Sequence, residues 1–165
     1  MKLLISGLVV AVCTLAGFGR AAGLNRRVRQ LDAALLLCEK LQSCLQYERR
    51  TSAELVSWLS GQESLRELTF LRRCAALLEE QKPFPEAWRQ SVEESGLAAD
   101  DRGLLLQIGE ILGGSRAESQ LGELAVLRSL LEESRAAAGA ERQQKGKLYH
   151  SLGILGGLGL AILLW

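Results

Sequence analysis

The residue types that most often carry chemistry are scarce in this sequence, and they do not cluster. The chain has one histidine, His150, and four cysteines: Cys13, Cys38, Cys44 and Cys74. Structural zinc sites are built from pairs such as C-x-x-C, and no such pair is present. We therefore expect no metal site. We expect the cysteines to be buried thiols in a reducing compartment, because a free cysteine behaves as a small hydrophobic side chain.

Motifs for nucleotide binding and for acid–base catalysis are also missing. The segment 113–116 (GGSR) lacks the flanking strand and the lysine of a phosphate-binding loop. His150 lies at the edge of an apolar segment with no carboxylate or second histidine near it in sequence, which favours a solvated side chain over a general base. We expect no catalytic residue, no cofactor and no small-molecule substrate.

The charge pattern points away from nucleic acid and towards a membrane. The net charge is only +1, and acidic and basic residues alternate through the middle of the chain. Both ends, in contrast, are apolar. The protein therefore reads as a polar body between two apolar ends.

The last segment, Leu148 to Trp165, has the length of a membrane span. As a helix it would cover roughly 27 Å, close to the hydrocarbon thickness of a bilayer. Arg142, Lys145 and Lys147 precede it, and lysine and arginine beside a span tend to stay in the cytoplasm. We predict a C-terminal transmembrane helix over 148–165; the alternative is a buried core helix.

A second apolar run, 3–19 (LLISGLVVAVCTLAGFG), predicts an N-terminal transmembrane anchor within residues 1–20. The alternative is a secretory signal, because Thr14-Leu15-Ala16 resembles a cleavage site. Arginines follow at once, at Arg20, Arg26, Arg27 and Arg29, and such a cluster resists translocation. We predict an uncleaved anchor and a body on the cytoplasmic side.

Residues 24–147 predict a helical bundle, because apolar residues recur there at steps of three and four. The run 82–85 (KPFP) and the pair Gly113-Gly114 interrupt the pattern. Thr51 with Glu54, and Ser64 with Glu67, fit capping boxes that open helices. The predicted core positions of the first helix are Leu24, Val28, Leu31, Leu35, Cys38, Leu41 and Leu45.

The last helix of the body opens near Ser115 and carries a stripe at Leu121, Leu124, Leu127 and Leu131. The polar, alanine-rich section 134–144 has little to bury, so we expect it to project from the bundle as a stalk. The predicted fold is therefore all-α: a cytoplasmic bundle of about six helices flanked by N- and C-terminal transmembrane helices.

Without catalytic residues, the helical body is expected to act by binding other molecules, and two classes of function remain. It is a scaffold in a membrane assembly, or a membrane-anchored receptor or regulator that binds a soluble partner or a small ligand between its helices. A deep apolar pocket with convergent polar groups would favour the receptor, and a filled core the scaffold.

Four features of the sequence, taken in order, resemble the stage III sporulation protein AB family of endospore-forming bacteria over the whole chain. They are the N-terminal apolar run followed by arginines, Pro85-Glu86-Ala87-Trp88 opening a helix, Leu112-Gly113-Gly114-Ser115 with Glu118 and Gln120 soon after, and 147–153 (KLYHSLG) leading into a glycine-rich apolar end. One departure is Arg116, where the family usually has an acidic residue.

The resemblance implies a role in the secretion-like channel complex between mother cell and forespore. It implies a body similar to the cytoplasmic domains of type II secretion platform proteins, located in the mother-cell cytoplasm and anchored in the outer forespore membrane. Its partners would be a secretion-type ATPase and other membrane components of the complex. The resemblance carries over Trp88, Gly113, Ser115 and Gln120 as partner-binding positions. Three of these positions also have a structural explanation: Trp88 as a core residue, Gly113 as a turn that needs a positive φ, and Ser115 as a helix cap.

Overall fold

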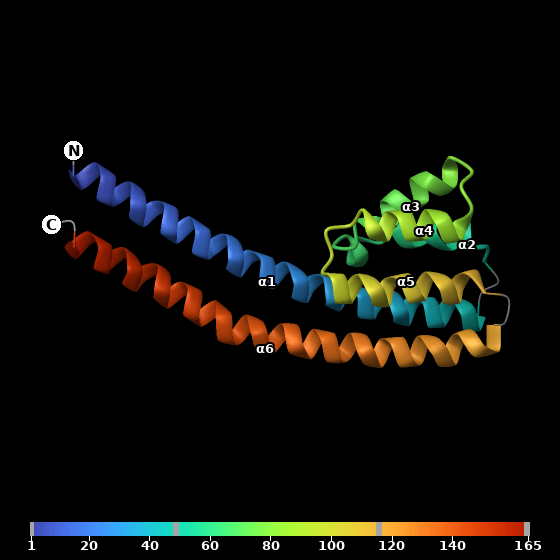
Figure 1. Cartoon of the computed structure of the whole chain (residues 1–165). Helices are drawn as coiled ribbons and strands as arrows, with labels where there is room; N and C mark the ends of the chain where they lie inside the picture. Colours follow the sequence, from blue (N-terminus) through green and yellow to red (C-terminus); the bar gives the residue numbers. More distant parts are fainter. Residues whose placement is uncertain (1, 48–49, 115–116, 164–165) are drawn as a thin grey trace. The chain divides into compact units, whose positions relative to one another are not determined.

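The computed structural model is all-helical over the residues that it describes, with six α-helices, which confirms the all-α part of the predicted fold (Figure 1). The backbone is described for residues 2–47, 50–114 and 117–163, and side chains for 22–47, 50–114 and 119–145. The elements in chain order are α1 (Lys2–Tyr47), α2 (Ser52–Ser60), the 3-10 turn η1 (Glu63–Leu65), α3 (Phe70–Glu79), α4 (Phe84–Glu93), α5 (Ala99–Gly113) and α6 (Ala117–Leu163).

The chain divides into two compact units whose boundaries fall inside the two long helices. One unit combines α1 up to Val28 with α6 from Ala136, and the other is Arg29–Arg135. The predicted domains follow the apolar ends of the sequence, with boundaries at residues 20 and 148, and they stay a prediction. Helices α1 and α6 are uninterrupted, with 46 and 47 residues, so no break in secondary structure marks these boundaries.

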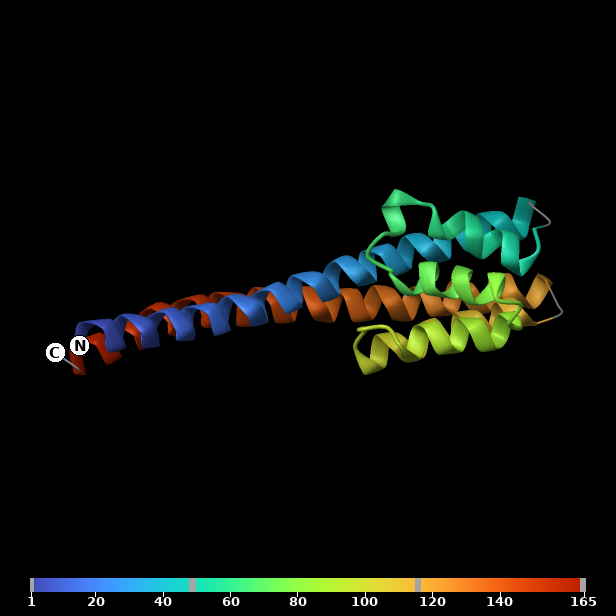
Figure 2. The same ribbon diagram turned by 90° about the horizontal axis from the view of Figure 1, so that it is seen from above.

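In the first unit, the start of α1 and the end of α6 run side by side and reach the same end (Figures 1 and 2). Val28 and Ala138 are buried, and the Arg27 guanidinium lies 3.7 Å from the Glu141 carboxylate. The section 134–144 is exposed or half-buried, as expected for a segment with little to bury, except at Ala138, which is buried. Ala138 is small, so a search of the sequence for large apolar residues does not identify it as a buried position.

The predicted membrane spans, 3–19 and 148–165, lie at helix ends whose side chains are outside the described residues. The backbone there is helical from Lys2 in α1 and up to Leu163 in α6. Among the described residues, no helix is both long enough and apolar enough to cross a membrane.

The second unit, Arg29–Arg135, holds the core of the bundle. Here α3 packs on both α2 and α4, and α4 packs on α5. The first part of α6 is tied to α1 by two ion pairs, Arg128 with Glu39 at 2.9 Å and Arg135 with Asp32 at 2.8 Å. The large, fully buried side chains come from α1 to α5 and from the segment between α2 and α3: Trp88, Phe70, Leu31, Leu37, Leu41, Leu59, Leu65, Leu68, Leu71, Leu77, Leu105 and Ile108.

The first of the two predicted capping boxes is confirmed at the start of α2. The Glu54 amide donates to Thr51 Oγ1 at 3.3 Å, and the Thr51 amide donates to Glu54 Oε2 at 3.0 Å. These hydrogen bonds from Thr51 hold the pKa of the Glu54 carboxyl below its usual range.

The second predicted capping box, Ser64 with Glu67, is wrong. Residues 63–65 form a 3-10 turn, and α3 begins only at Phe70. Both Leu65 and Leu68 are buried, and backbone bonds from Leu68 to Leu65 and from Leu71 to Leu68 keep this segment in tight turns. The burial of these two leucines determines the structure of this segment, and the capping pattern of Ser64 and Glu67 does not.

Helix α3 ends in a Schellman motif that places a glutamine where glycine is usual. The Lys82 amide donates to the Leu77 carbonyl and the Gln81 amide to the Leu78 carbonyl. Gln81 has a φ of 64°, in the left-handed region. Helix α4 starts at Phe84, and Pro85 lies in its first turn as predicted.

We expect Gln81→Gly to stabilise the protein by about 0.5 kcal/mol. Glycine removes the strain of the left-handed conformation, roughly 1 kcal/mol, and part of this gain is offset by the greater freedom of glycine in the unfolded chain. Thermal unfolding of the detergent-solubilised protein, followed by circular dichroism, measures the change. The control is Gln81→Ala, which loses the same side chain but keeps the strain, so a gain as large as that of the glycine variant would contradict the explanation.

Candidate partner-binding site

Trp88 on α4 is a core residue and presents no exposed surface to a partner. Its side chain is 1% exposed, and its Nε1 donates a hydrogen bond of 2.8 Å to the Leu105 carbonyl on α5. The Phe70 ring meets it edge-on with centroids 5.2 Å apart, and the Phe84 ring lies at 5.7 Å. Trp88 therefore joins α3, α4 and α5, which fits the structural explanation for this position.

Gly109 on α5 makes this packing possible, and the sequence reasoning missed it. A Cβ placed on Gly109 would lie 2.1 Å from Trp88 Cδ1 and 2.5 Å from Trp88 Nε1. The indole ring thus lies directly on the backbone of α5. A glycine isolated inside a helical apolar pattern was the available signal, because such a residue often marks close packing.

The remaining predicted positions lie around the end of α5. Gly113 is its last residue, and no described glycine has a positive φ, so the positive-φ turn expected at Gly113 is wrong. Ser115 lies outside the described residues. Gln120 on α6 is only 7% exposed, and its Nε2 donates hydrogen bonds of 2.8 Å to the carbonyls of Ile111 and Gly114. This amide satisfies the C-terminal end of α5 and joins that end to α6.

We expect Gln120→Leu to destabilise the protein by about 1 kcal/mol. The leucine fills a similar volume but leaves the Ile111 and Gly114 carbonyls without their side-chain donor. Urea unfolding in detergent measures the effect. The control is Gln107→Leu, an exposed glutamine on α5 for which we expect little change in stability; equal effects of the two variants would contradict the capping role.

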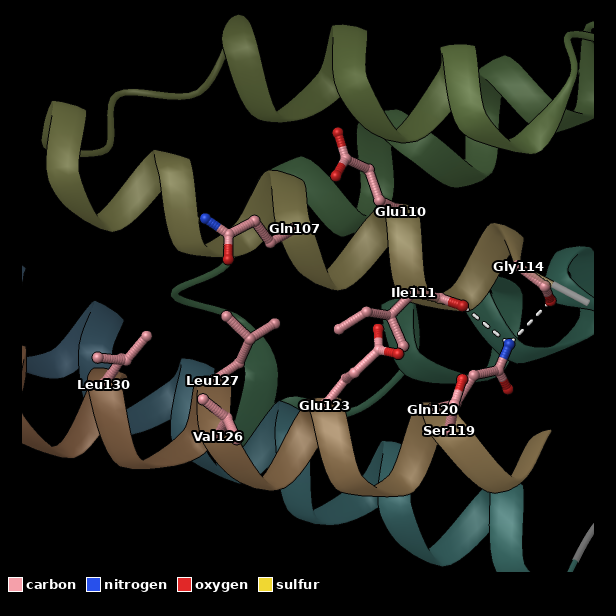
Figure 3. Close-up of a pocket in the computed structure, with 10 residues that line it drawn as sticks. All are labelled: Gln107, Glu110, Ile111, Gly114, Ser119, Gln120, Glu123, Val126, Leu127 and Leu130. Carbon is pink, nitrogen blue, oxygen red and sulfur yellow. Dashed lines mark hydrogen bonds between the residues drawn. The ribbon is translucent and has the colours of Figure 1, made fainter. Parts of the chain in front are cut away.

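An open groove of about 710 Å³ lies between α5 and α6 inside the Arg29–Arg135 unit (Figure 3). It is lined by Gln107, Glu110, Ile111, Gly114, Ser119, Gln120, Glu123, Val126, Leu127 and Leu130. Val126 is 62% exposed and Leu130 39% exposed, and they are two of the three exposed large hydrophobic side chains among the described residues. In sequence these two residues fall beside the predicted stripe of α6, whose members Leu124, Leu127 and Leu131 are buried.

A smaller cavity of about 270 Å³ lies on the other side of α5. It is lined by Pro85, Glu86, Trp88, Arg89, Leu106, Gly109 and Glu110. Glu110 lines both the groove and the smaller cavity, so α5 separates the two. Of the three carried-over positions that the structure describes, Gln120 lines the larger groove and Trp88 the smaller one.

Three of the buried titratable groups are thiols, and Asp101 contributes a buried carboxyl. Cys38, Cys44 and Cys74 are buried and form no disulfide, as predicted, whereas the side chain of Cys13 lies outside the described residues. Burial raises the pKa of Cys38 to about 12, against the opposing effect of the Arg128 guanidinium. Burial also raises the pKa of Cys74 to about 11, against a hydrogen bond with the Ser91 side chain. Among the described side chains, no three His, Cys, Asp or Glu residues gather as metal ligands would.

These features define an all-helical protein with a filled core and an apolar surface groove. The chain belongs to the stage III sporulation protein AB (spore_III_AB) family, whose model matches residues 2–165. The resemblance found from the motifs is thereby confirmed over the whole chain, and the family is one of stage III of sporulation. Neither the curated proteins nor the solved structures contain a significant match.

Proposed function

We propose that this protein is a non-catalytic, membrane-anchored platform component of the channel complex between mother cell and forespore, and that it docks a secretion-type ATPase. Family membership supports the link to sporulation. The observation that carries the rest is the pairing of α1 and α6, two uninterrupted helices whose apolar ends reach the same end of their unit (Figures 1 and 2).

The paired ends support anchoring in one membrane from one side. Residues 3–19 and 148–165 have the length and composition of spans, and basic residues follow the first and precede the second. Insertion with the arginines on the cytoplasmic side would leave the body in the mother-cell cytoplasm and the outer forespore membrane as its anchor.

The packing of the body supports a scaffold more than a receptor for a small ligand. Its largest apolar side chains are fully buried against one another. The groove between α5 and α6 has the volume of a ligand pocket, but its exposed lining suits a protein segment better than an enclosed small molecule. We place the ATPase and the other membrane components of the complex as partners on this body.

Cysteine labelling in sporulating cells tests the anchoring. One cysteine is introduced at the exposed Glu93 on α4, and in a second variant one is added after Trp165. The native thiols Cys38, Cys44 and Cys74 are kept because they are buried. We expect a membrane-impermeant maleimide to label the C-terminal cysteine and to reach the cysteine at position 93 only after lysis. Labelling of position 93 in intact cells would overturn the proposed orientation.

Co-purification with the ATPase tests the docking. Charge reversals on two exposed faces, Arg89→Glu with Glu93→Lys on α4 and Glu123→Lys on α6, are compared with the unchanged protein in detergent. We expect at least one face to lose binding while helicity by circular dichroism stays the same. Unchanged binding for both faces would rule out docking through them, and absence of binding by the unchanged protein would overturn the platform role.

A further inference from the structure

We propose that the groove between α5 and α6 binds a basic amphipathic helix of a partner protein. The inference rests on the proposed platform function and adds the location of the docking site and the chemistry of its occupant. It depends on three observations within the Arg29–Arg135 unit: an exposed apolar strip, a rim of unpaired carboxylates, and the geometry of two adjacent helices.

The apolar strip runs along α6 on the groove side. Val126 and Leu130 are one helical turn apart and exposed, and Leu127 lies beside them at the base of the groove (Figure 3). Ile111 contributes from α5. Leaving the exposed parts of Val126 and Leu130 in water is unfavourable by about 25 cal/mol for each Å² of apolar surface, so an apolar partner face would gain by covering them.

The polar lining is acidic. Glu110 from α5 and Glu123 from α6 are exposed, neither forms an ion pair with a described residue, and no basic residue lines the groove. The amide hydrogens of Gln120 are engaged by the Ile111 and Gly114 carbonyls. Two carboxylates beside an apolar strip complement a segment that presents lysine or arginine next to leucine-like side chains.

The shape of the groove suits a helix. Helices α5 and α6 are neighbours across it, and the valley between two helices receives the ridge of a third. A partner helix would place its apolar residues, spaced by three or four, on Val126 and Leu130, and its basic residues towards Glu110 and Glu123. This is the helix-in-groove mode of recognition.

Two synthetic 18-residue peptides test the chemistry directly. Both carry leucine at helical spacing, and the remaining positions are lysine in one and glutamate in the other. Binding is measured on the full chain in nanodiscs of zwitterionic lipid, with empty nanodiscs subtracted. We expect the lysine peptide to bind about tenfold more tightly, because two exposed ion pairs replace two like-charge contacts. Equal binding of the two peptides would overturn the inference.

Matched variants tie the peptide to the groove. Glu110→Gln with Glu123→Gln should reduce the preference for lysine below about threefold, and Val126→Ser with Leu130→Ser should weaken the lysine peptide about tenfold. The controls are Glu133→Gln, an exposed carboxylate outside the groove lining, and Tyr47→Ser, which removes a side chain that is 79% exposed at the end of α1. Equal losses in the control and groove variants would contradict the assignment.

The same variants separate failure of this inference from failure of the proposed function. If the ATPase binds the unchanged chain and the groove variants equally well, the groove is not its docking site although the platform role stands. If the ATPase binds neither, the platform role fails while the peptide preference still tests the groove. Sedimentation of the unchanged chain as a dimer that the serine variants dissociate would assign the groove to a second copy and overturn the proposal.

Discussion

Gly109→Ala is expected to destabilise the protein by about 3 kcal/mol or more. The new Cβ would lie 2.1 Å from Trp88 Cδ1, far inside van der Waals contact, and the nearest atoms belong to a rigid ring. Trp88 is held by its hydrogen bond to the Leu105 carbonyl and by the rings of Phe70 and Phe84, so it cannot move aside without loss. Urea unfolding of the detergent-solubilised chain by circular dichroism measures the change.

Gly103→Ala is the matched control for this prediction. Gly103 lies in the same helix, and a Cβ there meets nothing within 4 Å. Alanine at an open interior helix position should stabilise the protein by about 0.5 to 1 kcal/mol, because glycine loses more backbone entropy on folding. The two substitutions therefore have opposite signs, and a destabilisation of similar size at both positions would show that α5 simply tolerates no change.

A double variant locates the clash. Trp88→Leu removes the ring that the new Cβ would meet, so adding Gly109→Ala to it should cost much less than in the unchanged chain. The coupling between the two sites should reach at least 1 kcal/mol, as is typical of residues in direct contact. Strict additivity would contradict the packing of the indole ring on the α5 backbone.

The apolar periodicity of the sequence predicted the helices but not how closely they approach. In α5, Leu105, Ile108 and Leu112 recur at steps of three and four, and all three are buried. Gly109 belongs to the same face yet carries no hydrophobic signal, because its contribution is the absence of a side chain. Contact between Trp88 and Gly109 joins residues 21 positions apart, and no local pattern encodes such a contact.

The candidate site was predictable only in part for a related reason. The positions carried over from the resemblance include Trp88 and Gln120, which the structure shows to be buried and to hold α5 in place. The exposed Val126 and Leu130 were visible in the sequence as apolar residues beside the α6 stripe. The sequence could not show that Val126 and Leu130 line a groove, because the other side of the groove is formed by α5 and the position of α5 is known only from the structure.

The buried thiols should make the protein lose stability as the pH rises above about 9. Burial raises the pKa of Cys38 to about 12 and that of Cys74 to about 11, above the ordinary value of 9.0. Between these values the unfolded chain releases the thiol proton while the folded chain keeps it, so the unfolded state is increasingly favoured. Each thiol should lower the free energy of unfolding by up to about 1.4 kcal/mol per pH unit.

The stabilising contribution is complete below pH 9 and is lost as the pH rises through 11 for Cys74 and towards 12 for Cys38. Urea unfolding at intervals from pH 8 to pH 12 gives the slope. Lysine and tyrosine side chains titrate in the same range, so the informative quantity is the difference in slope between the unchanged chain and the variants Cys38→Ala and Cys74→Ala. Because lysine and tyrosine are the same in all three proteins, their effect cancels in this difference.

Each alanine variant should have a shallower decline than the unchanged chain, whatever its stability at pH 8. The Cys38→Ala variant should also differ most above pH 11, where only the Cys38 thiol is still protonated in the folded state. Parallel curves for all three proteins would mean that water reaches these thiols and that the cores around α1 and α3 open more readily than their packing indicates. If the free energy of unfolding declines steeply with pH only in the unchanged chain, the loss of stability at alkaline pH is due to Cys38 and Cys74, which the sequence already indicated as small core residues.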